Sequence, residues 1–137
     1  MDEELIDHDP DLKPSLTHIR EVNGKGRGAF ASVGCAAGSI IDEAHTIEFS
    51  PAEFSAVNST MFRNYYFIRD TSAGAEQGLL VLGKISLLNH SANPNAIVEF
   101  IETREGVVAR LKALREIRQS EEITIDYDVP LWFDCID

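Results

Sequence analysis

The chain has 137 residues, 44% of them hydrophobic and 26% charged, and 23 acidic residues against 12 basic ones give a formal net charge of −11. This length and composition predict one domain with its own core and exclude wholesale disorder. No apolar run approaches the roughly 20 residues that a membrane-spanning helix needs, and the N-terminus is acidic, unlike that of a secretory signal peptide. We therefore expect a soluble, intracellular protein.

The negative charge is concentrated at the N-terminus. Residues 1–12 contain six acidic residues and no basic one. Such a segment is usually solvated, so we expect a flexible acidic tail over residues 1–14 and a single domain over residues 15–137. A chain this acidic is a poor match for nucleic-acid phosphates and is better suited to a basic protein or peptide partner.

Short strand-like segments separated by Gly, Asn or Ser turns make up most of the chain. They are predicted at residues 16–22, 27–33, 39–49, 64–69, 78–82, 96–102, 106–112 and 122–127. The segments at 96–102 and 106–112 predict a β-hairpin, because only a short turn separates them.

One helix start is well marked. Ser50 is a capping residue, Pro51 suits the first helical position, and Glu53 stands three residues after the cap, where its side chain can bond back. This helix is predicted to end near residues 59–60, and a second short helix or turn is predicted over residues 83–88. The chain is therefore predicted to be mostly β, with one or two short helices.

The glycine-rich segment 24–30 precedes a predicted strand. Closely spaced glycines allow positive φ and let the backbone approach a ligand. Alone, the segment fits an ordinary β-turn, because it lacks the Lys-Ser/Thr of a phosphate loop and opens no helix.

A polar heptapeptide at residues 89–95 separates two apolar runs. Its amides, hydroxyl and imidazole must be satisfied by the protein or by a ligand. His90 could be a structural histidine, a base or a metal ligand. No other His, Cys or acidic residue stands at ligand spacing around it, which argues against a metal.

Two further segments carry aromatic residues. Residues 121–127 alternate apolar and polar positions and end at Tyr127, and the aromatic stretch 65–67 lies in a predicted strand. Each pattern alone is more typical of a packed strand than of a functional site.

In this order and spacing, the segments resemble the SET-domain family of protein lysine methyltransferases. The family has a glycine-rich turn, an Asn-His-Ser-x-x-Pro-Asn segment, and a Glu-(Glu/Leu)-(Ile/Leu)-Thr-x-x-Tyr segment about thirty residues later. Here residues 26–30 read Gly-Arg-Gly-Ala-Phe, residues 89–95 read Asn-His-Ser-Ala-Asn-Pro-Asn, and residues 121–127 read Glu-Glu-Ile-Thr-Ile-Asp-Tyr. The resemblance covers roughly residues 15–134, and the length is similar to that of the minimal viral and bacterial-type members.

The resemblance implies a SET-domain, β-clip-like fold of several small sheets with a C-terminal pseudoknot, where residues 89–95 meet residues 124–127. It implies that S-adenosylmethionine binds on one face and a lysine peptide on the other, joined by a narrow channel. The implied reaction is methyl transfer to a lysine amine of a basic, histone-like protein.

The family's site residues can be carried onto this sequence. The implied cofactor-binding residues are Gly26, Arg27, Gly28, Phe30, Tyr65, Asn89, His90 and Trp132. The implied channel residues are Tyr66, Leu131 and Phe133, with Tyr66 also an alternative to Tyr65. Tyr127 would be the catalytic side chain, orienting an amine that has lost its proton in an apolar channel.

The sequence departs from the family in two places. Many members carry another tyrosine shortly after the strand-end one, whereas residues 128–131 here read Asp-Val-Pro-Leu. This leaves the number of methyl groups open and supports an alternative, a catalytically impaired module that binds the cofactor and recognises a protein. The zinc-binding cysteine segment of many members is also missing, so no metal is expected, and the apolar C-terminus is compatible with a homodimer.

Overall fold

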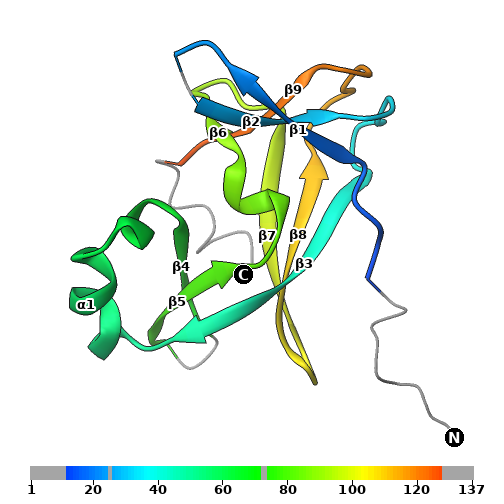
Figure 1. Ribbon diagram of the computed structural model, residues 1–137. Coiled ribbons are helices and arrows are strands. Elements are labelled where there is room, and N and C mark those ends of the chain that lie inside the picture. The colour runs from blue at the N-terminus through cyan, green and yellow to red at the C-terminus, as the bar shows by residue number, and fades with distance from the viewer. Residues whose placement is uncertain (1–11, 25, 72–73, 128–137) are drawn as a thin grey trace, which may run out of the picture.

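The computed structural model describes residues 12–24, 26–71 and 74–127, and strands dominate it, as predicted (Figure 1). In chain order the elements are β1 (Thr17–Val22), β2 (Gly26–Ala31), β3 (Ile40–Phe49), the short helices η2 (Pro51–Glu53), α1 (Phe54–Asn58) and η3 (Met61–Asn64), β4 (Tyr66–Asp70), β5 (Glu76–Val81), the short helix η4 (Lys84–Leu87), β6 (Asn89–His90), β7 (Ala96–Thr103), β8 (Gly106–Ala113) and β9 (Glu122–Ile125). Each predicted strand has a counterpart, and β6 is an addition. Within these ranges, no helix has the length and hydropathy needed to cross a membrane.

The strands form two small sheets. The larger has the order β4-β5-β3-β8-β7, and its β7–β8 hairpin pairs from Ala96↔Ala113 to Thr103↔Gly106. The smaller has the order β1-β2-β9-β6 and lies at the top of Figure 1. In it β9 runs antiparallel to β2 but parallel to β6, so the chain must cross over between β6 and β9.

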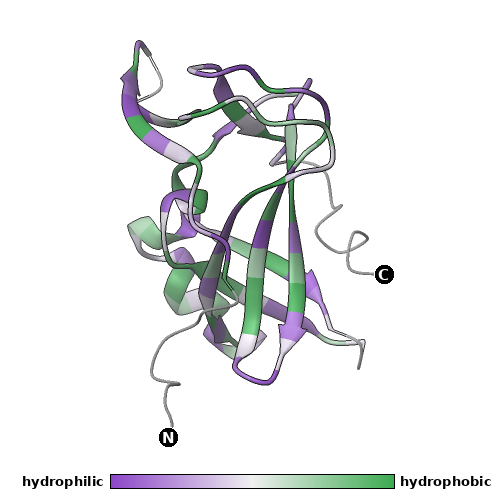
Figure 2. Ribbon diagram, turned by 90° about the vertical axis from the view of Figure 1, so that its right-hand side faces the viewer, coloured by the Kyte–Doolittle hydropathy of each residue, from purple (hydrophilic) through white to green (hydrophobic). Residues whose placement is uncertain are grey.

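Alternating side chains build one core between the sheets. Along β7 buried and half-buried residues alternate, and Figure 2 shows green and purple bands alternating along the long strands. A single cluster of buried apolar residues joins both sheets. Its largest members are exposed by less than 2%: Ile41, Leu79, Ile85, Leu111, Ile117 and Ile123.

The predicted capping interaction at Ser50 is wrong, although a helical segment does begin there. The Ser50 side chain makes no capping hydrogen bond. The amide of Glu53, which that side chain would have bound, donates instead to the Ser50 carbonyl at 2.9 Å and closes a 3₁₀ turn. The segment continues only as the five-residue helix α1. The second predicted helix is confirmed as η4.

The predicted acidic tail falls mostly on residues 1–11, which lie outside the described residues. At its C-terminal end, the Lys13 amide donates to the Glu43 carboxylate at 2.8 Å. The domain boundary at residue 15 stays a prediction.

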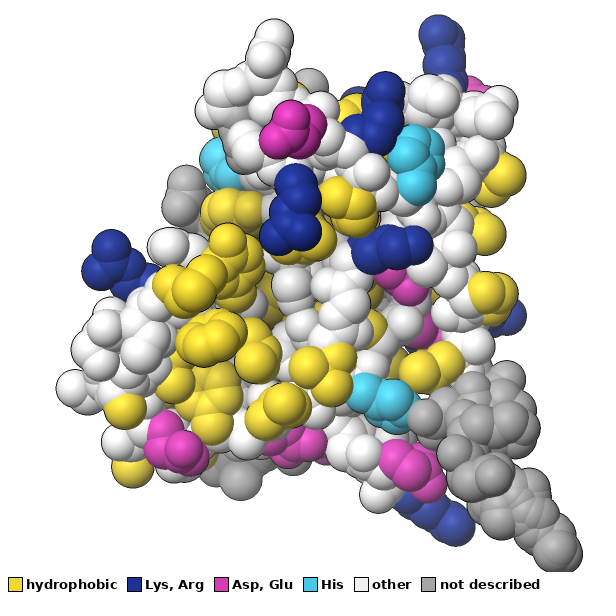
Figure 3. Space-filling view, in the orientation of Figure 1, with side chains coloured by type: hydrophobic (Ala, Val, Ile, Leu, Met, Phe, Trp, Pro, Cys, Tyr) yellow, Lys and Arg dark blue, Asp and Glu magenta, His cyan; other side chains and the backbone are white. Residues whose placement is uncertain are grey.

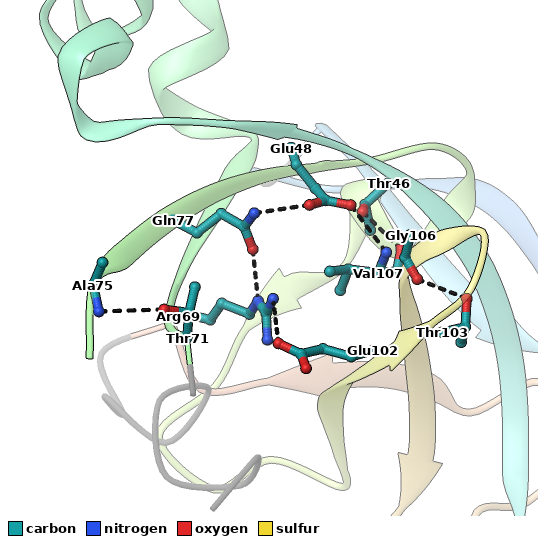
Figure 4. Close-up of polar contacts among 10 residues, drawn as sticks. All are labelled: Thr46, Glu48, Arg69, Thr71, Ala75, Gln77, Glu102, Thr103, Gly106 and Val107. Carbon is teal, nitrogen blue, oxygen red and sulfur yellow. Dashed lines mark hydrogen bonds and ion pairs between the residues drawn. The ribbon is translucent and has the colours of Figure 1, made fainter. Parts of the chain in front are cut away.

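A buried arginine links the strands at the far end of the larger sheet (Figure 4). Arg69 on β4 is 4% exposed, and it donates to Gln77 Oε1 at 2.8 Å and to Glu102 Oε2 at 3.0 Å. Gln77 in turn donates to Glu48 at 2.8 Å, and Glu48 accepts the Val107 amide at 3.1 Å. One guanidinium therefore anchors a polar network that reaches β4, β5, β3, β8 and β7.

We predict that Arg69→Ala lowers the free energy of unfolding by about 2 kcal/mol, because hydrogen bonds to a buried charged group are lost. The exposed position of Glu102 (54%) limits the effect. The measurement is urea unfolding. Lys112→Ala is the control, since its ion pair with Glu99 is more exposed on the lysine side (37%) and should be worth less than about 1 kcal/mol. Equal losses of unfolding free energy in both variants would contradict the role of Arg69 as the anchor of this network.

Candidate active site

Residues 89–95 and the end of β9 lie side by side, as the family resemblance predicted. Asn89 pairs with Thr124 and His90 with Ile125 in a short parallel ladder, and the Ser91 amide donates to the Ile125 carbonyl at 2.9 Å. The chain that would complete the predicted pseudoknot follows Tyr127 and lies outside the described residues.

Asn95 completes this junction with its side chain. It is 2% exposed, its Nδ2 donates to the Glu122 carbonyl at 2.8 Å, and its Oδ1 accepts the Thr124 amide at 2.9 Å. The amide side chain thus pairs with β9 as a neighbouring strand would. This buried polar group is satisfied by the protein itself.

Asn89 is held by β2 and β9 together. Its Nδ2 donates to the Arg27 carbonyl at 3.1 Å and to Glu122 Oε2 at 2.8 Å. Gly28 leaves room for this contact, since a Cβ there would lie 2.6 Å from Glu122 Oε2 and 2.8 Å from Asn89 Nδ2. A larger residue at the second glycine of the motif would have to displace the ends of these two side chains.

His90 supports Tyr127. Its Nδ1 accepts the Tyr127 amide at 2.9 Å and lies 3.5 Å from the Asp126 carboxylate, and the two rings are 5.3 Å apart. With Nδ1 as an acceptor, the neutral ring carries its proton on Nε2. Of the three roles left open for His90, a structural one matches this geometry.

Tyr127 folds back over β6, with its hydroxyl donating to the Leu88 carbonyl. Partial burial, followed by the nearby Tyr65 phenol and Glu122 carboxylate, raises the pKa of the Tyr127 hydroxyl above its usual value of 10.0. The phenol is therefore neutral over the physiological pH range and can donate and accept hydrogen bonds. The residue is still 46% exposed, so it is accessible to a ligand.

A cavity of about 740 Å³ opens beside these residues. It is lined by Gly26, Arg27, Arg63, Asn64, Tyr65, Tyr66, Phe67, Ile85, Ser86, Leu87, Leu88, Asn89, Ile125 and Tyr127. The lining residues include two arginines, three adjacent aromatic residues, an asparagine and Tyr127. Such an apolar wall with a few polar groups is typical of a small-molecule site.

The cavity brings together many of the residues that the sequence singled out. Its lining includes the following predicted residues: Gly26, Arg27, Tyr65, Tyr66, Asn89 and Tyr127. Gly28 and His90 are not among the lining residues; they lie next to Asn89 and Tyr127, and their predicted cofactor contacts stay predictions. The roles assigned to Leu131, Trp132 and Phe133 fall outside the described residues.

Phe30 is not among the residues that line the cavity. It is 8% exposed, and the Arg20 guanidinium lies 3.9 Å from its ring centroid. Its neighbour on the other strand is His18, 6.1 Å away between ring centroids. The structure therefore places Phe30 in a packing role, and its predicted cofactor contact stays a prediction.

Tyr65 and Tyr66, which the sequence left as alternatives, differ in their surroundings, and their predicted roles stay predictions. Tyr65 lies close enough to Tyr127 for its phenol to affect the pKa there. The Tyr66 hydroxyl instead donates to Asn58 on α1 at 2.7 Å, while its ring packs on Phe49 at 5.2 Å. Tyr66 therefore lines the cavity with its hydroxyl already bonded to Asn58.

Sequence reasoning missed several cavity residues. Arg63 and Asn64 come from η3, and their only signal was their position directly before the aromatic stretch 65–67. The apolar run 85–88 was noted, but nothing in it indicated that its residues would line a cavity. In the part of the chain that the structure describes, no group of three or more His, Cys, Asp or Glu could hold a metal.

We predict that Gly28→Ala destabilises the protein by about 1–3 kcal/mol, because the added methyl group must push apart Asn89 and Glu122. Thermal unfolding measures the effect. Gly34→Ala is the matched control, since a Cβ there meets only the Ile117 carbonyl at 3.8 Å and its φ is not positive. A Gly28→Ala protein as stable as the Gly34→Ala protein would show that this close packing is not required.

Comparison with known proteins agrees with this geometry. The SET domain family model matches residues 26–128. A curated relative from Schizosaccharomyces pombe, a histone-lysine N-methyltransferase specific for H3 lysine-37, is 33% identical over 121 residues, covering 88% of this chain and 78% of the relative. A crystal structure from Plasmodium falciparum, described as that of a candidate histone methyltransferase, superimposes with a TM-score of 0.69 at 25% identity and covers 88% of this chain and 99% of that one. The chain therefore belongs to the SET domain family.

Proposed function

We propose that this protein-lysine N-methyltransferase takes its methyl group from S-adenosylmethionine and transfers it to a lysine in a basic, histone-like protein. The observation that carries the proposal is the cavity in which Tyr127, Asn89 and Arg63 converge from separate parts of the chain. The histone-lysine specificity of the curated relative and the net charge of −11 support a basic protein substrate.

The cavity has groups that match each part of S-adenosylmethionine. Its volume of about 740 Å³ is within the usual range for small-molecule sites. Arg27 and Arg63 offer guanidinium groups to the carboxylate. Asn89 donates through Nδ2, and no donor among the described residues reaches its Oδ1, which can accept from the ammonium group. The aromatic wall suits the adenine ring.

The chain's own residues orient the substrate amine and line the site with apolar side chains that exclude water. When bound, S-adenosylmethionine provides an electrophilic methyl group on a sulfonium. The wall formed by Phe67, Ile85 and Leu88 disfavours a charged ammonium, so that the substrate amine enters as the neutral nucleophile. The Tyr127 oxygen can accept a hydrogen bond from this amine, because its own proton is donated to the Leu88 carbonyl. Positioning of this kind accounts for large rate gains without a strong base.

We predict that Tyr127→Phe lowers kcat about 10- to 100-fold and changes affinity for S-adenosylhomocysteine less than threefold, since about 1–3 kcal/mol of hydrogen bonding to the amine is lost. The assay is transfer of labelled methyl groups to histone H3, with calorimetry for binding. Tyr66→Phe should have a smaller effect, because its hydroxyl is bonded to Asn58. Unchanged turnover in Tyr127→Phe would refute the role, and cofactor binding without any transfer by the native protein would favour the impaired module.

The pH dependence of the rate provides a second test of the same residue. Because the pKa of Tyr127 is raised above 10.0, less than half of the phenol is ionised at pH 10.0, and stability linked to the neutral phenol is lost as pH rises through the folded-state value. We expect the rate to increase with pH as the substrate amine loses its proton. A decline below pH 10.0 that disappears in Tyr127→Phe would contradict this assignment.

We predict that Arg63→Gln weakens binding of S-adenosylhomocysteine about 5- to 20-fold, because a charge-assisted bond to the carboxylate is lost. Binding of 5′-methylthioadenosine should be unchanged, since that ligand has no carboxylate. Calorimetry with both ligands distinguishes binding of the carboxylate from binding of the rest of the ligand. Arg104→Gln, an exposed position at the β7–β8 turn, is the control. Equal weakening of both ligands would show that Arg63 does not bind the carboxylate.

A further inference from the structure

One face of the larger sheet is apolar and faces away from the core. Ile47, Leu80 and Tyr66 are direct neighbours across β3, β5 and β4, so their side chains project from the same face. Alternation along each strand adds the residues two positions away. We call this surface the outer face. Its apolar residues on the strands are Ile47, Phe49, Tyr66, Ile68 and Leu80, and Leu82 follows directly after β5, where its amide bonds to the His45 carbonyl of β3.

The outer face is more exposed than a packed surface would be. Ile47 is 52% exposed and Leu82 is 49% exposed, whereas Leu79 and Val81 on the opposite face are 0% and 2% exposed. Figure 3 shows hydrophobic side chains gathered over α1, β3, β4 and β5 on the side facing the viewer. Contiguous exposed apolar surface is typical of interaction sites.

Aromatic side chains of the outer face pack against one another and against α1. Phe49 lies over Gly78, where a Cβ would come within 2.4 Å of its ring. Phe49 also contacts Tyr66 at 5.2 Å and Phe54 of α1 at 5.8 Å between ring centroids, both edge-on. A partner would therefore meet a preformed surface.

The outer face ends in two carboxylates. Asp70 and Glu76 are direct cross-strand neighbours, both are exposed, and both project from this face by alternation from Ile68 and Gly78. Like charges directly opposite each other destabilise a sheet. None of the ion pairs found in the described part of the chain includes either residue. A basic group from outside would relieve this repulsion.

The charges of the possible partners also indicate which of them binds the outer face. A second copy would bring another chain of net charge −11. The chain's own residues 128–137 contain three aspartates and no basic residue, so they also carry the wrong sign. A basic segment with apolar residues is complementary both to the apolar side chains of the outer face and to its two carboxylates.

We propose that the outer face binds a basic, apolar segment of the protein substrate, at a distance from the lysine that is methylated. This inference rests on the proposed function. Tyr66 belongs to the outer face and also lines the cavity, so the two surfaces are continuous. Lys or Arg of the segment pairs with Asp70 and Glu76, and its apolar residues cover Ile47 and Leu82.

Two double variants test the proposal with purified histone H3 as the probe. Asp70→Asn with Glu76→Gln should raise Kd and KM for H3 about 3- to 10-fold and reduce the salt dependence of binding. Ile47→Ser with Leu82→Ser should raise both constants about 10-fold. In each case kcat and the affinity for S-adenosylhomocysteine should stay unchanged.

Matched controls keep the same chemistry at other exposed positions. Glu105→Gln with Glu116→Gln changes the net charge equally, and Val33→Ser with Leu114→Ser removes apolar side chains that are 46% and 51% exposed. Neither control should change H3 binding. Weakening by the controls equal to that by the test variants would overturn the proposal.

Other outcomes separate this inference from the proposed function. Histone binding by the native protein without methyl transfer, lost in the test variants, would refute the function and retain the docking face. Transfer with KM unchanged in the test variants would refute the docking face alone, as would absence of H3 binding. Ultracentrifugation showing a dimer that the test variants dissociate would assign the face to a second copy. Loss of cofactor affinity in the test variants would show that they disturb the cavity and would overturn the docking face.

Discussion

The parallel pairing of β6 with β9 is the constraint on which the site depends. The pair is only two residues long, and it is stabilised by the Asn95 side chain, which bonds to β9 at the Glu122 carbonyl and the Thr124 amide. Because this pairing joins segments more than thirty residues apart, it brings Asn89 and Tyr127 to one cavity. Loss of the pairing would separate the groups proposed to bind the cofactor from the phenol proposed to orient the amine.

Charge is distributed unevenly between the cavity and the rest of the molecule. The chain as a whole is strongly acidic, yet Arg27 and Arg63 line the cavity. The outer face beside it ends instead in the carboxylates of Asp70 and Glu76. This separation gives an anionic group of a small molecule and a basic protein segment different places to bind, on surfaces that meet at Tyr66.

The sequence predicted the parts of the site that have a local pattern. The polar heptapeptide, the strand ending at Tyr127 and the glycine-rich turn were recognisable from residue type and order, and their expected meeting is confirmed for residues 89–95 and β9. Arg63 has no local pattern, because an arginine in a short helix is usually a solvated surface residue. Phe30 was assigned to the cofactor from its motif, but packing against Arg20 and His18 determines its surroundings. The Ser50 side chain does not cap the helix, because the Glu53 amide that it would bind donates to the Ser50 carbonyl instead.

By itself, the sequence determined the strand-rich composition, the positions of the strands, the family, and the acidic character that suits a basic substrate. These properties follow from residue alternation, turn residues and charge, which act over a few neighbouring positions or over the whole chain at once. Only the tertiary structure decided which residues line the cavity, which side chains a Cβ at Gly28 would meet, and that Tyr65 lies close enough to Tyr127 to influence its pKa, while the Tyr66 hydroxyl bonds to Asn58. Those outcomes depend on distances between segments far apart in the chain, and such distances are set by strand register and core packing.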